Sequence, residues 1–167
     1  YKFDARRIIT GRIAAGQLKV GDHLVFSPSN KRANIRTVEA FNIEPQPTEG
    51  QAGQSIGVTL DDQIFVERGE IASHQEHLPS VSTAFRANLF WLGKRPLEKE
   101  RKYLLRVATK EVDCEVASIH RIIDTMDLAQ QQGSNTVNKN QVAELTLRTK
   151  TPVAFDLSAS FEATGRF

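Results

Sequence analysis

The sequence predicts an all-β protein built from two antiparallel β-barrels. Several segments alternate apolar and polar residues with a period of two, which is typical of strands with one face on a core. Turn-forming residues recur between these segments, and no amphipathic helical pattern extends beyond about two turns. Because small antiparallel sheets commonly hide their edges by closing, we expect barrels.

The first predicted element is a β-hairpin within residues 11–26. Two apolar-alternating runs, 17–20 and 23–26, are separated by Gly21-Asp22, a pair that favours a turn. The glycines at either end of the first run favour further turns. We therefore expect the two runs to pair with each other.

Later strands follow from the same alternation, and they are expected over residues 56–60, 112–116 and 143–147. Two longer irregular stretches, residues 44–54 and 130–141, are expected to be surface loops. The strongest helical candidate is a short segment near residues 127–132. The predicted secondary structure is thus almost entirely strand and turn.

A boundary is expected near the middle of the chain. Residues 73–82 lose the alternation and include Pro79, which suits a linker between two halves of similar length. We therefore predict one barrel over residues 1–79 and a second over residues 83–167.

Composition restricts the class of partner and the compartment. The chain has 22 basic and 20 acidic residues, a net charge of +2, so bulk electrostatics does not favour nucleic-acid binding. Cys114 is the only cysteine, which excludes an internal disulfide and suits the cytoplasm. No apolar run approaches the roughly 20 residues of a membrane helix, so we expect no membrane association. Residues 1–4 resemble neither a signal peptide nor an initiating methionine, and we expect a segment of a longer protein.

The motifs of nucleotide binding are absent from the sequence. No Gly-x-x-x-x-Gly-Lys-Ser/Thr loop is present to hold phosphates with backbone N–H groups, and residues 93–95 lack its spacing and hydroxyl. Residues 138–141, Asn-Lys-Asn-Gln, resemble a guanine-binding motif but end in an amide where a carboxylate is needed. A polar loop explains them better.

The residues that could carry other chemistry also have ordinary structural explanations. His74 and His77 lie three apart without further His or Cys ligands nearby in sequence, so solvated linker residues are favoured over a metal site. His120 follows an apolar run and is expected to be a hydrogen-bonded residue at a strand end. Cys114 lies within an alternating strand and is expected to be a buried apolar residue. Asp61-Asp62 is best explained by a turn, because adjacent strand residues point to opposite faces.

Three basic clusters could form a phosphate-binding surface beside Phe90-Trp91 as a stacking platform. The clusters are Arg6-Arg7, Lys31-Arg32, and Lys99 with Arg101-Lys102. Glu98 and Glu100 interrupt the third cluster, and solvated strand faces are the favoured interpretation. We predict no catalytic, cofactor-binding or metal-binding residue in this segment.

Two blocks of sequence carry a resemblance to a known family. Residues 1–41, with Gly-Arg-Ile-Ala-Ala-Gly followed by Leu-Lys-Val-Gly-Asp, together with residues 52–73, resemble the second domain of translation-factor GTPases. Residues 85–128 and 138–156, with Phe-Trp-Leu and Val-Ala-Glu-Leu-Thr-Leu, are similar to the third domain of the large, GTP-hydrolysing subunits of bacterial sulfate adenylyltransferase.

This resemblance implies Greek-key barrels like domains 2 and 3 of elongation factor Tu. It also implies a parent enzyme that couples GTP hydrolysis to the formation of adenosine 5′-phosphosulfate from ATP and sulfate. GTP and Mg²⁺ would bind to a GTPase domain preceding Tyr1, and a separate small subunit would transfer the adenylyl group. The segment itself would be a structural, coupling and docking module that contacts both. The alternatives are an RNA-binding module of a translation elongation factor, which the charge balance disfavours, and an independent enzyme, which lacks a convergent polar site.

Overall fold

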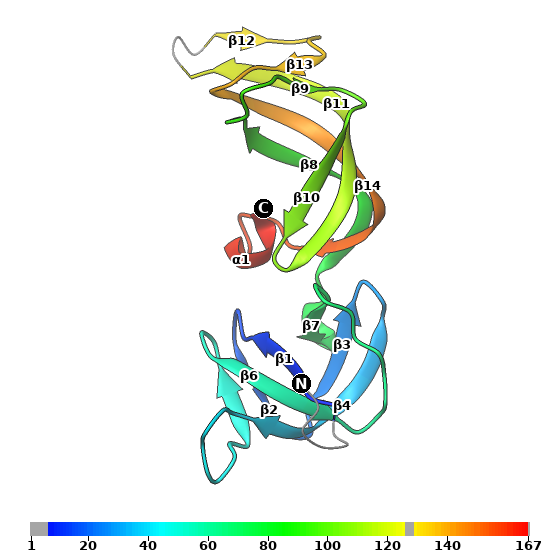
Figure 1. Ribbon diagram of the computed structural model, residues 1–167, viewed down its shortest axis with the longest axis vertical. Coiled ribbons are helices and arrows are strands. Elements are labelled where there is room, and N and C mark those ends of the chain that lie inside the picture. The colour runs from blue at the N-terminus through cyan, green and yellow to red at the C-terminus, as the bar shows by residue number, and fades with distance from the viewer. Residues whose placement is uncertain (1–6, 126–128, 167) are drawn as a thin grey trace. The chain divides into compact units, whose positions relative to one another are not determined.

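The computed structural model describes residues 7–125 and 129–166, which divide into two compact units (Figure 1). The first unit runs through Ser80 and includes Asp156–Gly165, and the second runs from Val81 to Phe155 and includes Arg166. The division at Ser80 lies between the two ranges expected from the sequence, whereas residues 156–165, expected in the second barrel, group with the first unit. The strand pairings whose register is given by the structure are all antiparallel, and the predicted all-β fold class is confirmed.

The first unit contains a five-stranded sheet in the order β1-β6-β4-β3-β7 and a two-stranded sheet, β2-β5. Its elements are β1 (Ile9–Arg12), β2 (Gln17–Lys19), β3 (His23–Ser27), β4 (Lys31–Glu39), β5 (Glu49–Gln51), β6 (Ser55–Leu60), β7 (Ile71–His74) and the 3-10 helix η1 (Gln75–His77). The short helix α1 (Glu162–Gly165) belongs to the segment that groups with this unit. Its core is formed by Leu24, Phe26, Ile35, Val38 and Val58.

The second unit contains a sheet in the order β10-β11-β14-β8, with β12 paired to β11, and a small sheet of β13 and β9. Its strands are β8 (Ser80–Phe90), β9 (Leu97–Glu98), β10 (Lys102–Val107), β11 (Lys110–Asp124), β12 (Gln130–Gln131), β13 (Thr136–Val137) and β14 (Gln141–Phe155). None of the helices in residues 7–125 and 129–166 combines the length and apolar character that a membrane crossing requires.

The hairpin predicted within residues 11–26 is wrong, because its two runs, 17–20 and 23–26, do not pair with each other. Strand β2 pairs with β5, whereas β3 pairs with β4 and β7. The intervening turn is closed by the Asp22 N–H donating to the Lys19 carbonyl at 3.1 Å, with Gly21 at φ +90° in its third position. A positive φ at that position is the pattern of a type II turn, which splays its flanking strands, so the turn directs the chain into a different sheet.

Two predicted loops contain strands, and the described part of the predicted helix is not helical. Strand β5 lies within residues 44–54, and β12 and β13 lie within residues 130–141. The helical candidate 127–132 lies partly outside the described residues, and its described part includes β12. These strands have two or three residues, too short for an alternating pattern to reveal them.

The two longest strands pair across the centre of the second unit. Residues 141–149 of β14 alternate strictly, with every second side chain buried. Strand β11 alternates in the same way only up to Val116, because the register with β14 then shifts twice. Ala117 and His120 are the extra residues, so each lies in a β-bulge that redirects the side chains after it.

Candidate functional site

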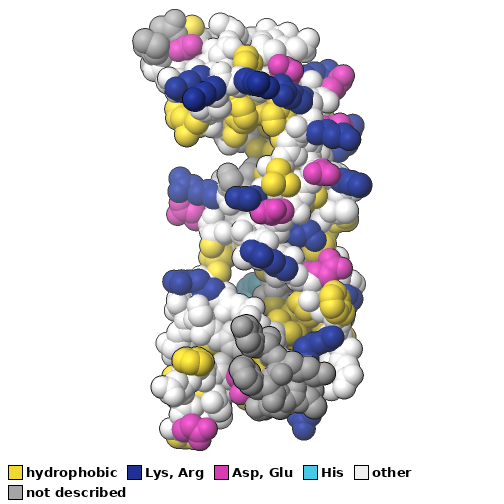
Figure 2. All heavy atoms as spheres, viewed as in Figure 1, with side chains coloured by type: hydrophobic (Ala, Val, Ile, Leu, Met, Phe, Trp, Pro, Cys, Tyr) yellow, Lys and Arg dark blue, Asp and Glu magenta, His cyan; other side chains and the backbone are white. Residues whose placement is uncertain are grey.

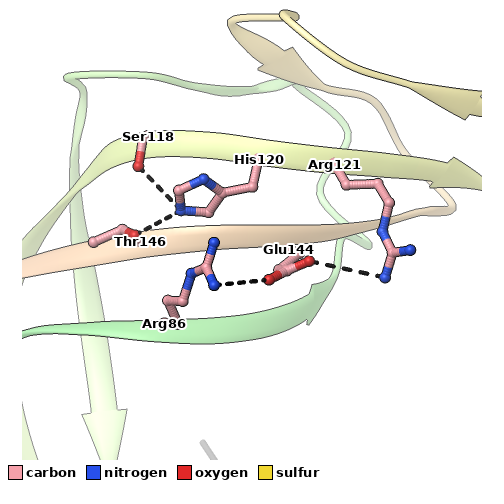
Figure 3. Close-up of polar contacts among 6 residues, drawn as sticks. All are labelled: Arg86, Ser118, His120, Arg121, Glu144 and Thr146. Carbon is pink, nitrogen blue, oxygen red and sulfur yellow. Dashed lines mark hydrogen bonds and ion pairs between the residues drawn. The ribbon is translucent and has the colours of Figure 1, made fainter.

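His120 lies in the second bulge of β11 and belongs to a polar network (Figure 3). Its Nε2 is 2.8 Å from the Thr146 hydroxyl on β14 and 3.3 Å from the Ser118 hydroxyl. Both hydroxyls meet the same ring nitrogen, and the described residues provide no carboxylate to Nδ1. A serine–histidine nucleophile needs a third group that orients the histidine through its other nitrogen. The arrangement therefore fits a hydrogen-bonded strand residue.

Glu144 links two arginines beside this histidine. Its carboxylate is 3.6 Å from Arg86 on β8 and 3.8 Å from Arg121 on β11, so the three charges bridge three adjacent strands (Figure 3). The arginines are 67% and 45% exposed. Exposed pairs of this kind contribute less than about 1 kcal/mol each, and the network offers a charged surface more than a stabilising clamp.

His74 and His77, expected to be linker residues, have different environments. His74 is in β7, where its Nε2 is 3.1 Å from Asp22 Oδ2, which also accepts the Lys19 N–H at 2.8 Å. This contact ties β7 to the turn before β3. His77 lies exposed in η1. The described residues bring no three His, Cys, Asp or Glu side chains close enough to hold a metal ion.

Asp61 and Cys114 lie in environments that indicate structural roles. Asp61, in the loop after β6, accepts hydrogen bonds from the Asn34 side-chain amide at 2.6 Å, the Asn34 N–H at 2.8 Å and the Asp62 N–H at 2.9 Å. The Asn34 amide, followed by its N–H, holds the pKa of Asp61 below its ordinary value. Cys114 is buried in β11, and loss of solvent raises the pKa of its thiol, with Asp113 adding to the shift. A buried thiol with a raised pKa is a poor nucleophile.

In the first two basic clusters, Arg7 and Lys31 have defined contacts. Arg6 lies outside the described residues. The Arg7 guanidinium and Lys31 Nζ lie 5.5 and 5.8 Å from the centre of the Phe65 ring and donate hydrogen bonds to the carbonyls of Ile64 and Phe65. These two cations therefore hold the loop between β6 and β7 through cation–π and hydrogen-bond contacts.

The third cluster borders a hollow in the second unit, where β8 ends and β10 begins. The hollow has a volume of about 340 Å³. It is bounded by Trp91, Tyr103 and the basic residues Lys94, Arg95, Arg101 and Lys102, and we call it the basic hollow. In Figure 2, basic side chains lie in a row beside a hydrophobic patch over β9 and the end of β8.

The Trp91 side chain is held by contacts inside the second unit and forms part of the wall of the basic hollow. Its Nε1–H donates to the Arg95 carbonyl at 2.8 Å, and its ring meets Tyr103 edge-on at 6.0 Å between centroids. The backbone of Gly93 packs on the indole, since an added Cβ would lie 2.5 Å from Cζ2. The stacking platform considered and disfavoured at Phe90-Trp91 would have to use a Trp91 ring that already contacts Gly93 and Tyr103, while Phe90 is half-exposed. Sequence reasoning tested Lys94 and Arg95 only against a phosphate-loop pattern and did not group them with the third basic cluster, although the density of basic residues after position 93 was a signal for that.

These features define a pair of small antiparallel β units with charged outer surfaces, a class found in translation-factor GTPases. A family model described as GTP-eEF1A C-terminal domain-like matches residues 84–167. The chain belongs to this family.

The chain is also similar to curated proteins along nearly its whole length. It is 32% identical over 159 residues to sulfate adenylyltransferase subunit 1 of Francisella tularensis, covering 94% of this chain and 33% of that protein. It is 30% identical over 164 residues to the protein of the same name from Shewanella oneidensis, with 95% and 33% covered. The chain thus spans about a third of the length of these relatives.

A solved structure shows the same fold. The crystal structure of Sup35 complexed with GDP superposes with a TM-score of 0.88 at 18% identity and covers 99% of this chain and 41% of that one. Identity this low supports the fold alone.

Proposed function

We propose that this chain is the two-barrel portion of the large, GTP-hydrolysing subunit of a sulfate adenylyltransferase. The observation that carries the proposal is the length of the sequence match, which covers 94–95% of the chain at 30–32% identity and therefore includes both units. The parent enzyme would form adenosine 5′-phosphosulfate from ATP and sulfate in the cytoplasm.

In this proposal the chain acts by contacting the GTPase domain and the small subunit of the enzyme. GTP and Mg²⁺ bind to a GTPase domain outside this chain, and a small subunit carries out adenylyl transfer. His120 has no orienting acid in the described residues, and Cys114 is buried with a raised pKa, so neither is suited to chemistry. GTP hydrolysis can drive a distant reaction only if some element binds differently to the two GTPase states, and the barrels would provide that contact.

The second candidate is an RNA-binding barrel module of a translation elongation factor. It is supported by the fold shared with Sup35 and by the basic hollow. The net charge of +2 gives it no general electrostatic support. The sequence match to the sulfate enzymes extends over the same residues at higher identity, and we therefore place the RNA function second.

The test is co-purification of the chain with the small subunit of the same organism at moderate salt. A parallel titration with tRNA is made at two salt concentrations, because phosphate contacts weaken steeply as salt rises. Retention of the small subunit, with weak tRNA binding, is the expected result. Tight, salt-sensitive tRNA binding without retention would support the translation-factor alternative instead.

A further inference from the structure

Positive charge is concentrated around the basic hollow. Residues 94–102 include five basic and two acidic residues, a net charge of +3, whereas the whole chain carries +2. Within this segment Arg101 lies 3.5 Å from Glu98 and Lys99 lies 3.6 Å from Glu100, so each carboxylate already has a basic partner. In the described part of the chain, three basic side chains of the hollow have no ion pair or side-chain hydrogen bond: Lys94, Arg95 and Lys102.

The two walls that carry these cations are fixed by contacts inside the unit. The loop with Lys94 and Arg95 is anchored by the Trp91 Nε1–H bond to the Arg95 carbonyl and by Gly93 packed on the indole. The opposite wall is anchored by Tyr103, whose hydroxyl accepts the Glu98 N–H at 2.7 Å. Backbone that is ordered before binding lowers the entropic cost of engaging a partner.

We propose that the basic hollow docks an acidic peptide segment of a partner protein, with carboxylates placed on Lys94, Arg95 and Lys102. This inference deepens the docking role proposed above and rests on it. A guanidinium can hold a carboxylate through two parallel N–H···O bonds, and ammonium groups add charge-assisted bonds. Arg is also one of the residue types that most often dominate binding energy at protein interfaces.

The hollow fits an acidic peptide better than a nucleic acid. Single-stranded nucleic acid is held by cations along a track together with aromatic rings on which bases stack. Here the Trp91 ring is packed against Gly93 and Tyr103, so its contacts are already used within the fold.

The experiment measures binding of a fluorescein-labelled dodecapeptide of alternating Glu and Asp to the chain by fluorescence anisotropy. The test variant is Lys94→Glu/Arg95→Glu, and Lys102→Glu alters the opposite wall alone. The control variant is Arg12→Glu/Arg32→Glu, which makes the same change in net charge at exposed positions of the first unit. Circular dichroism and Trp91 emission check that each variant is folded.

We expect both hollow variants to weaken peptide binding, the double variant at least tenfold, while the control changes the affinity less than twofold. Equal losses in all variants, or no binding by the unaltered chain, would overturn the inference. Loss of tRNA affinity in the hollow variants, with no binding of the peptide, would overturn it in favour of a nucleic-acid site. The proposed function has its own readout, because retention of the small subunit by the unaltered chain tests that function whatever the peptide does.

Discussion

The substitution Gly93→Ala is predicted to distort the basic hollow by steric overlap. The added Cβ would lie 2.5 Å from Trp91 Cζ2 and 2.6 Å from Cε2, whereas non-bonded carbons prefer about 3.5–4.0 Å. Gly93 does not have a left-handed φ, so the effect comes from the overlap and not from backbone preference. The indole must therefore move by about 1 Å.

The size of the effect follows from the contacts that this movement disturbs. The hydrogen bond from Trp91 to the Arg95 carbonyl contributes about 0.5–1.5 kcal/mol. The edge-on contact with Tyr103 contributes about 0.5–1.5 kcal/mol. Together they predict a loss of about 1–3 kcal/mol in the free energy of unfolding, which agrees with the usual cost of overpacking.

The assay uses the fluorescence of Trp91, the only tryptophan in the chain, during urea unfolding. With a slope of about 1–3 kcal/mol per molar urea, the midpoint should fall by about 1 M, and the emission maximum should shift to the red in the absence of urea. Gly11→Ala is the matched control, because an added Cβ at Gly11 meets no atom within 4 Å. If Gly93→Ala leaves both midpoint and emission unchanged, as the control should, the packing of this loop on Trp91 is refuted.

Three further outcomes are expected. Leu145→Ala, at a fully buried position of β14, should destabilise the second unit by about 2–5 kcal/mol in the same assay, and Leu104→Ala, at a position 57% exposed, by no more than about 0.5 kcal/mol. Cys114 should be alkylated by iodoacetamide at pH 8 at least tenfold more slowly in the folded chain than in guanidinium, because burial raises its pKa; equal rates would contradict this. Because hydrogen bonds from Asn34 lower the pKa of Asp61, that carboxylate adds stability above the unfolded pKa of roughly 4, and this is lost as the pH falls. Asp61→Ala should therefore show a weaker fall in stability with acid, and an unaltered pH profile would exclude the contribution.

The all-β class could be predicted because apolar and polar residues alternate along the core strands. Leu145 and Leu147 are buried on the same face of β14, as their spacing of two requires. The full extent of β11 could not be predicted in this way, since the bulges at Ala117 and His120 interrupt the period. The strand partners could not be predicted either, because the type of the turn at Gly21 is defined by backbone dihedral angles that the sequence does not state.

The basic hollow shows why a surface site is harder to predict than a core. Sequence reasoning considered Trp91 and the basic residues near Arg101 as a possible phosphate-binding surface and favoured solvated strand faces over it. Their relation depends on contacts of a few side chains, such as the bond from Trp91 to the Arg95 carbonyl, that no periodicity encodes. A core position, in contrast, must satisfy the same apolar requirement in every second residue of its strand.

The attraction of a charged partner depends on the charges near its binding site and less on the net charge of the whole chain. The net charge of +2 disfavours nucleic acids in general, but at about 0.1 M salt a charge acts over only about 10 Å. A partner at the hollow therefore experiences mainly the charges near it, which include residues 94–102 and Glu115, the residue opposite Lys102 on β11. Residues 94–102 have a net charge of +3, which means that the remainder of the chain is slightly acidic. An acidic partner segment would then be attracted to the hollow. Such a local attraction favours one docking orientation over others, as coupling between GTP hydrolysis and a second active site would require.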